Sequence, residues 1–191
     1  MIQRLLIVLI TLCFACSCTR QEAATKQEII KYVFNQSNRL HWIKKTDAFE
    51  LRLTFKPSDL IAQDQMITTT KNEFDSLSNV YSKFYYFVLE INYKGKDLGQ
   101  YYVLKEQDFA REINQVISNV CLIDQDNKCI NPIDYSIING FGLTPNTYVM
   151  AFNKPSDREF DIVVESAKWG LQQIAFTFDK KEIQKVPRLI N

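Results

Sequence analysis

The feature of this sequence that most constrains its fold is the run from Tyr85 to Tyr93, in which large apolar residues occupy every second position. Successive side chains of a β-strand point to opposite faces of a sheet, so the pattern predicts a strand with one buried face. That face consists of Tyr85, Phe87, Leu89, Ile91 and Tyr93. The opposite phase becomes polar toward the end of the run, at Glu90 and Asn92. The sequence therefore predicts a sheet, with this run as its best-defined strand.

Alternating residues and turn signals predict the other strands, and capping residues predict the helices. A hairpin is expected over residues 40–55, and further strands over 100–104, 121–124, 133–138, 148–152, 160–165 and 174–178. The patterns Thr25…Glu28 and Thr70…Glu73 are capping boxes, which start helices. Helices are expected over residues 25–34, 60–65, 70–84 and 106–120, and a last one is capped by Asp179 and Glu182 and stops at Pro187.

The order of these segments predicts the fold class. Strands that are near in sequence and joined by short turns usually pair antiparallel, and helices then pack on the sheet. We therefore expect an α+β fold, with a mostly antiparallel sheet and helices packed on one face. Aromatic residues make up 13% of the chain, and there are only five Gly and five Pro, which is typical of a packed domain. A single globular domain over residues 25–191 follows.

The first residues read MIQRLLIVLITLCFACSCTR and have a different character. After Arg4, an uncharged run from Leu5 to Ala15 is too short for the roughly 20 residues of a membrane-spanning helix and has the length of a signal-peptide core. It ends among three cysteines, Cys13, Cys16 and Cys18. Apolar neighbours and the lack of a second ligand cluster downstream argue against a zinc or iron–sulfur site. The segment is therefore interpreted as an export signal.

A cysteine that follows a small residue directly after such a run resembles the lipobox of bacterial lipoproteins. The resemblance implies that residues 1–17 are removed, that Cys18 carries acyl chains such as palmitate, and that residues 18–24 form a short tether. Cys16 is the alternative, but Cys13 three positions before it departs from the family pattern more than Ala15 does before Cys18. Thr19-Arg20 lacks the aspartate that retains such proteins in the inner membrane, which favours the outer membrane. An ordinary secretory signal without lipid is the other interpretation.

The numbers of charged residues and of cysteines limit which partners and which disulfide the mature chain can have. Without the leader, 22 Lys and Arg balance 22 Asp and Glu, which argues against nucleic acid and against capture by anionic lipid through net charge. Membrane attachment would then come from the acyl chains, and another envelope protein is the expected partner. Cys121 and Cys129 remain as a pair that could close the loop CLIDQDNKC by a disulfide in an oxidising compartment. Two reduced thiols are the alternative.

Few residues suggest catalysis or a cofactor. His41 is the only histidine, so any histidine relay must include it, and it falls on the polar phase of a predicted strand. The stretch from Asp124 begins like a calcium loop but has Cys129 at its sixth position, where glycine is needed. We therefore expect a plain turn there, and neither metal nor cofactor. Residues 139–142 contain two glycines but lack the setting of a phosphate loop.

Two further groups carry the functional alternatives. Asp157, Glu159 and Asp161 are two positions apart, so in a strand their carboxylates lie on one face. Pairs of carboxylates are the catalytic groups of most glycoside hydrolases. Tyr86 and Tyr102 lie on two strands expected to pair, and they could form an exposed face that binds sugar or peptide. The sequence favours a lipid-anchored, non-catalytic binding or assembly component of the cell envelope over an enzyme. The alternative is an envelope hydrolase that uses paired carboxylates.

Overall fold

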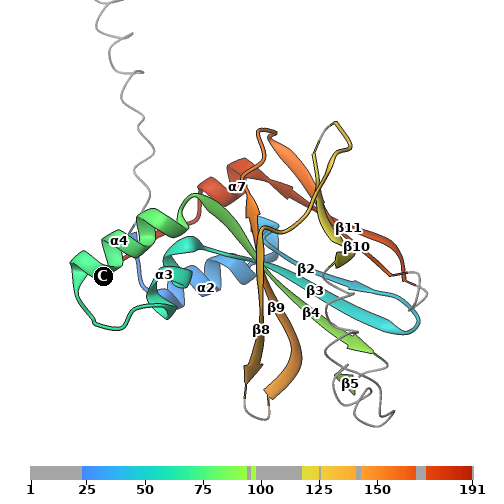
Figure 1. Ribbon diagram of the computed structural model, residues 1–191, viewed down its shortest axis with the longest axis horizontal. Coiled ribbons are helices and arrows are strands. Elements are labelled where there is room, and N and C mark those ends of the chain that lie inside the picture. The colour runs from blue at the N-terminus through green and yellow to red at the C-terminus, as the bar shows by residue number, and fades with distance from the viewer. Residues whose placement is uncertain are drawn as a thin grey trace, which may run out of the picture.

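The computed structural model describes residues 23–93, 96–97, 118–124, 126–140, 143–166 and 171–190. These residues form two antiparallel sheets, a short parallel strand pair and several short helices (Figure 1). The antiparallel pairing and the mixture of helices and strands agree with the predicted class. The described strands, however, divide into separate sheets.

The larger sheet has the strand order β2-β3-β4-β9-β8, and β5 pairs with β4. Its strands are β2 (His41–Lys45), β3 (Phe49–Lys56), β4 (Phe84–Tyr93), β5 (Lys96–Asp97), β8 (Asp134–Gly140) and β9 (Leu143–Asn153). The smaller sheet has the order β11-β10-β6-β7, with β6 (Val120–Ile123), β7 (Cys129–Ile130), β10 (Glu159–Ser166) and β11 (Leu171–Asp179). Strand β1 (Ala23–Ala24) pairs in parallel with β12 (Arg188–Leu189), so the two ends of the described chain lie together.

The helices are short. They are α2 (Lys26–Phe34), the 3-10 turn η1 (Gln36–Asn38), α3 (Ser58–Asp64), α4 (Lys71–Tyr81) and α7 (Lys180–Gln184). In Figure 1, α2, α3 and α4 gather at one end of the larger sheet. The capping box at Thr25 is complete, and Asp179 caps α7 through the Lys181 amide, as predicted.

The second predicted capping box forms only in part. Thr70 accepts a bond from the Glu73 amide at 3.4 Å, but the Glu73 carboxylate turns to the amides of Ile67 and Thr68 in the preceding loop. Two backbone donors outside the helix therefore replace the reciprocal bond to Thr70. The helix also ends at Tyr81, earlier than expected, because Phe84 already belongs to β4.

The main core lies between the two sheets. Phe87 on β4 is fully buried, with its ring centroid 4.8 Å from that of Phe178 and 6.2 Å from that of Phe160. Tyr85 stacks on Phe160 at 5.9 Å. The aromatic phase predicted for β4 is thus buried as expected, but the second sheet covers it where helices were expected. Strands β10 and β11 carry an apolar phase of their own, so the two apolar sheet faces bury each other.

Candidate functional site

A pocket of about 440 Å³ lies where the first residues of β4 meet α3, α7 and β12. Apolar side chains, among them Phe55, Tyr85 and Ile183, form part of its wall. The rest of the wall is polar and includes three basic side chains. Because its lining comes from segments at positions 55–59, 82–85, 154 and 180–188, the fold alone assembles it.

Three cations converge on this pocket. Lys154 directly follows β9, Lys180 is the first residue of α7, and Arg188 begins β12. The Lys154 ammonium lies 5.1 Å from the centroid of the Tyr85 ring, a cation–π contact, and Lys180 donates a hydrogen bond to the Pro155 carbonyl at 3.4 Å. Burial lowers the pKa of Lys154, and the charges of Lys180 and Arg188 lower it further. The three like charges therefore repel one another inside a shared cavity.

Asp59 is the one carboxylate among the described residues that line the pocket, and it already accepts hydrogen bonds. Its side chain is buried and accepts hydrogen bonds from the Ser78 hydroxyl at 2.8 Å, the Leu189 amide at 3.1 Å and the Arg188 guanidinium at 3.3 Å. Within the described ranges, neither Lys154 nor Lys180 forms an ion pair with a carboxylate. Among the described lining residues, three cations thus lie beside one carboxylate and apolar surface, an arrangement that could orient an anion.

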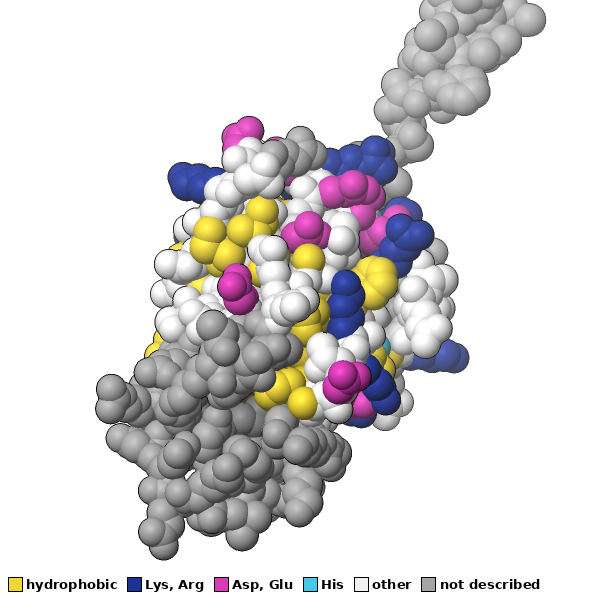
Figure 2. All heavy atoms as spheres, turned by 90° about the vertical axis from the view of Figure 1, so that its right-hand side faces the viewer, with side chains coloured by type: hydrophobic (Ala, Val, Ile, Leu, Met, Phe, Trp, Pro, Cys, Tyr) yellow, Lys and Arg dark blue, Asp and Glu magenta, His cyan; other side chains and the backbone are white. Residues whose placement is uncertain are grey.

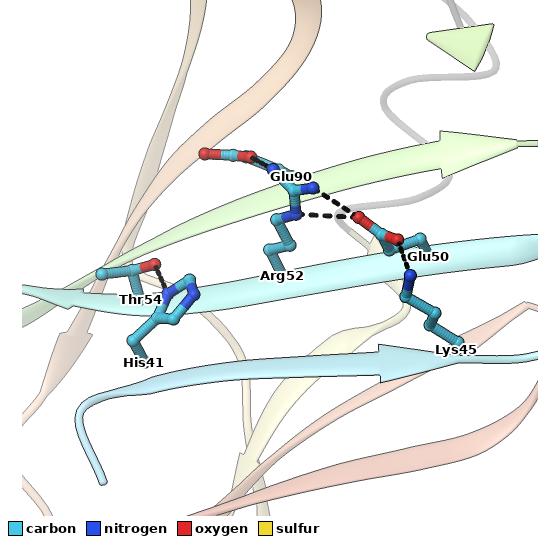
Figure 3. Close-up of polar contacts among 6 residues, drawn as sticks. All are labelled: His41, Lys45, Glu50, Arg52, Thr54 and Glu90. Carbon is cyan, nitrogen blue, oxygen red and sulfur yellow. Dashed lines mark hydrogen bonds and ion pairs between the residues drawn. The ribbon is translucent and has the colours of Figure 1, made fainter. Parts of the chain in front are cut away.

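A second polar cluster lies on the outer face of the larger sheet, across β2, β3 and β4 (Figure 3). Arg52 on β3 contacts Glu50 at 2.6 Å and Glu90 of β4 at 3.7 Å, and Lys45 of β2 contacts Glu50 at 2.7 Å. Hydrogen bonds from Lys45 and Arg52 lower the pKa of Glu50, so this carboxylate stays ionised and is unsuited to donate a proton. Ion pairs this exposed contribute little to stability, and those that join neighbouring strands support cross-strand pairing.

His41 belongs to the same face, as its position in the alternation predicted. Its Nδ1 lies 2.8 Å from the Thr54 hydroxyl oxygen, and its ring centroid is 4.7 Å from that of Phe34 on α2. Burial beneath the helix lowers the pKa of the imidazole. Its described contacts are the Thr54 hydroxyl and the Phe34 ring, and they include no carboxylate at hydrogen-bond distance to orient the imidazole, so they indicate a packing role. Figure 2 shows basic, acidic and apolar side chains intermixed on the side of the molecule that it displays.

Tyr86 and Tyr102 were predicted as a binding face. Tyr86 is only 7% exposed, packs against Ile61 and Tyr81, and lines a second cavity of about 400 Å³ together with Lys56 and Asp134. Burial raises its pKa to about 12, with smaller contributions from Tyr81 and Asp134. Tyr102 lies outside the described residues. Binding at this face stays a prediction, and its described member is an inward-packed ring with access to a cavity.

The carboxylates proposed for hydrolysis lie on β10 and just before it. Asp161 accepts a hydrogen bond from Thr177 at 2.6 Å, and Glu159 is opposite Asp179 in the strand register. Asp161 is thus held by a cross-strand hydroxyl, and Asp157 precedes the strand. These positions place Glu159 and Asp161 along one strand, with Asp179 of the adjacent strand β11 as the register partner of Glu159.

The cysteines fall into two groups. Cys16 and Cys18 lie outside the described residues, so lipidation stays a prediction. Cys121 on β6 and Cys129 on β7 are both free thiols. The pKa of Cys121 is raised to about 12, first by burial and then by a hydrogen bond with Cys129. The two sulfurs are therefore neighbours, but the predicted disulfide remains untested.

The loop between these cysteines is a turn, as predicted. The Asp124 carboxylate accepts bonds from the amides of Asp126 at 3.1 Å and Lys128 at 2.9 Å, and Asn127 adopts a left-handed φ of 57°. Across the described residues, no group of three or more His, Cys, Asp or Glu side chains is placed to hold a metal ion. Of the helices that the structure describes, none has both the length and the apolar character needed to cross a membrane.

The sequence pattern missed the residues of the cation-lined pocket. Lys154, Lys180 and Arg188 lie in turns or at element ends, and nothing in their spacing links them. Asp59 was part of a predicted helix start, Pro57-Ser58-Asp59, where acids are common. Its position after Pro57 indicated the helix, but its burial depends on α4 and β12.

Comparison with known proteins adds little. No family model and no curated protein matches this chain. Among solved structures, a DUF4426 family protein from Pseudomonas aeruginosa PAO1 is similar, with a TM-score of 0.38 and 14% identity. The match covers 72% of this chain and 94% of that one. Functional inference therefore depends on the residues and contacts described above.

Proposed function

We propose that this chain is a lipid-anchored, non-catalytic binding or assembly component of the cell envelope, attached to the outer membrane through Cys18. The observation that carries the proposal is the uncharged run from Leu5 to Ala15, followed by Ser17 and Cys18 a few residues before β1. Its partners are the membrane, through covalent lipid, and another envelope protein. We also propose that helices α2 and α3 pack on one face of the larger sheet. Ile30 and Phe34 of α2 and Val88 of β4 line a cavity of about 290 Å³ there.

The chemistry of the described acids supports binding over hydrolysis. A glycosidase with two carboxylates needs one with a raised pKa, so that it can act as a general acid. Hydrogen bonds lower the pKa of three acids: those from Lys45 and Arg52 act on Glu50, those from the Thr68 hydroxyl and the loop amides on Glu73, and that from the Lys181 amide on Asp179. The acids with shifted pKa in the described segments thus hold their negative charge more firmly than usual, which suits structural ion pairs.

The experiment that tests the anchor compares Cys18→Ala with Cys16→Ala in the full-length chain. Cells are supplied with labelled palmitate, and the protein is followed in membrane and soluble fractions. We expect Cys18→Ala to abolish the label and to release the protein from membranes, while Cys16→Ala keeps both. Persistence of label in Cys18→Ala, with loss in Cys16→Ala, would move the anchor to Cys16. Label kept in both variants would refute attachment at Cys18, and absence of label from the unmodified chain would refute lipid attachment.

A further inference from the structure

We infer that the pocket formed by Lys154, Lys180 and Arg188 binds the phosphate of a membrane-lipid headgroup. The identity of the ligand as a membrane lipid rests on the proposed lipid anchor. Its identity as an anion rests on the pocket alone. The two parts can therefore fail separately.

The demand for an anion follows from the charges around the cavity. Lys154 and Lys180 are not paired with a carboxylate within the described part of the chain, and they share the pocket with Arg188. A tetrahedral phosphate places several acceptor oxygens among these donors and removes their mutual repulsion. The same repulsion is what lowers the pKa of Lys154 beyond the effect of burial.

Arg188 is held in place for this role. One guanidinium nitrogen, Nη1, lies 3.3 Å from Asp59, and the Leu189 amide next to it donates to the same carboxylate. A guanidinium has five N–H donors, so the contact with Asp59 orients the group and leaves donors for a ligand. Because the oxygens of Asp59 already accept three hydrogen bonds, its negative charge is neutralised in part at the base of the pocket.

The short segment between Cys18 and β1 would hold this pocket near the membrane. Ala23 of β1 is the register partner of Arg188, and the Ile190 amide bonds to the Ala24 carbonyl at 2.9 Å. A fully extended chain from Cys18 to Ala23 reaches at most about 18 Å, and paired strands lie about 5 Å apart. Arg188 is therefore within roughly 23 Å of the proposed lipid attachment point. Because the net charge of the chain is nearly balanced, long-range electrostatic attraction would not bring the pocket to the membrane surface. The short tether would keep the pocket near the lipid headgroups instead.

The first measurement is calorimetric titration of the full-length chain, purified from membranes in a non-ionic detergent, with inorganic phosphate. The double variant Lys154→Gln/Lys180→Gln removes two pocket charges. The matched control, Lys31→Gln/Lys71→Gln, removes two exposed charges from α2 and α4. We expect at least a tenfold loss of phosphate affinity in the pocket variant and less than a twofold change in the control. No phosphate binding, or equal losses in both variants, would overturn the anion site.

The second measurement identifies the source of the phosphate. Phosphate titration is repeated in the presence of nanodiscs that contain phosphatidylglycerol. We expect the lipid to compete with phosphate and to weaken its apparent affinity at least fivefold in the unmodified chain. Phosphate binding that the nanodiscs leave unchanged would overturn the lipid assignment and point to a free phosphate compound. Competition in a chain that proves to carry no acyl group would uphold the pocket and refute only the proposed anchor.

Discussion

The buried carboxylate of Asp59 joins three elements, and its removal should destabilise the domain strongly. Its oxygens accept bonds from Ser78 of α4, Leu189 of β12 and Arg188 of β12. Hydrogen bonds to charged groups contribute about 1.5–3 kcal/mol each, while an ion pair to a half-exposed guanidinium contributes at most about 1 kcal/mol. The Asp59→Ala change should therefore cost about 3–5 kcal/mol, in the range expected when one partner of a buried charged pair is removed.

The measurement is reversible urea or thermal unfolding of the full-length chain in detergent. For a domain of this size, each kcal/mol lowers Tm by about 2–4 °C, so a loss of about 3–5 kcal/mol in Asp59→Ala should lower Tm by about 6–20 °C. Asp59→Asn is the matched variant, because it keeps one oxygen acceptor and loses the charge. We expect it to cost about half as much. Ser78→Ala removes one bond and should cost about 1–2 kcal/mol.

A double-mutant cycle decides whether the carboxylate acts as described. If Asp59 and Ser78 interact directly, the free-energy losses of Asp59→Ala and Ser78→Ala should fail to add by at least about 0.5 kcal/mol. Limited proteolysis should also cut near Leu189 faster in Asp59→Ala, because β12 loses its bond to α3. A loss of unfolding free energy below about 1 kcal/mol in Asp59→Ala, with additive effects, would refute the role of this carboxylate as the link between the three elements.

Three other predictions follow from the described contacts. Phe87→Ala should cost about 3–5 kcal/mol of unfolding free energy because it opens a cavity between the sheets, whereas Phe34→Ala, at a half-exposed ring, should cost far less; equal losses would contradict the inter-sheet core. Burial lowers the pKa of His41 from 6.5, so the unfolded chain takes up a proton first as the pH falls, and stability should decrease from about pH 7 to pH 5. The decrease should be smaller in His41→Gln, and an identical pH dependence in the two proteins would exclude this cause. Cys121 and Cys129 are free thiols in the structure but neighbours, so an oxidising envelope should join them. Alkylation of the protein isolated from the envelope should then label them only after reduction, and full labelling without reductant would rule out the disulfide.

Short-range patterns predicted much of the local structure correctly. The hairpin of β2 and β3 turns at residues 46–48, the buried phase of β4 is the predicted one, and Thr25 and Glu28 form their capping box. These features depend on residues two to four positions apart, whose relation is fixed by the geometry of one strand or one helix turn. The half-formed box at Thr70 shows the limit, because amides outside the helix competed for Glu73.

The predicted role of the leader depends on the sequence alone. Its length, lack of charge and terminal cysteines predict export and lipid attachment through a local pattern that needs no folded partner. The balance of charge in the mature chain likewise argued against nucleic acid before any contact was known. These conclusions concern location and partners, and they leave the surface of the domain undetermined.

The sequence by itself predicted the long strands among the described residues, most of their helix starts and the expected place of the protein in the cell. Only the tertiary structure decided that the described strands divide into two sheets, which bury Phe87 against Phe178. It also decided that Lys154, Lys180 and Arg188 share a pocket above Asp59. Asp59 and Leu189 are 130 positions apart, and their contact depends on how whole elements pack. The local sequence around a lysine in a turn does not show which distant residues surround it, and those residues determine what its charge can bind.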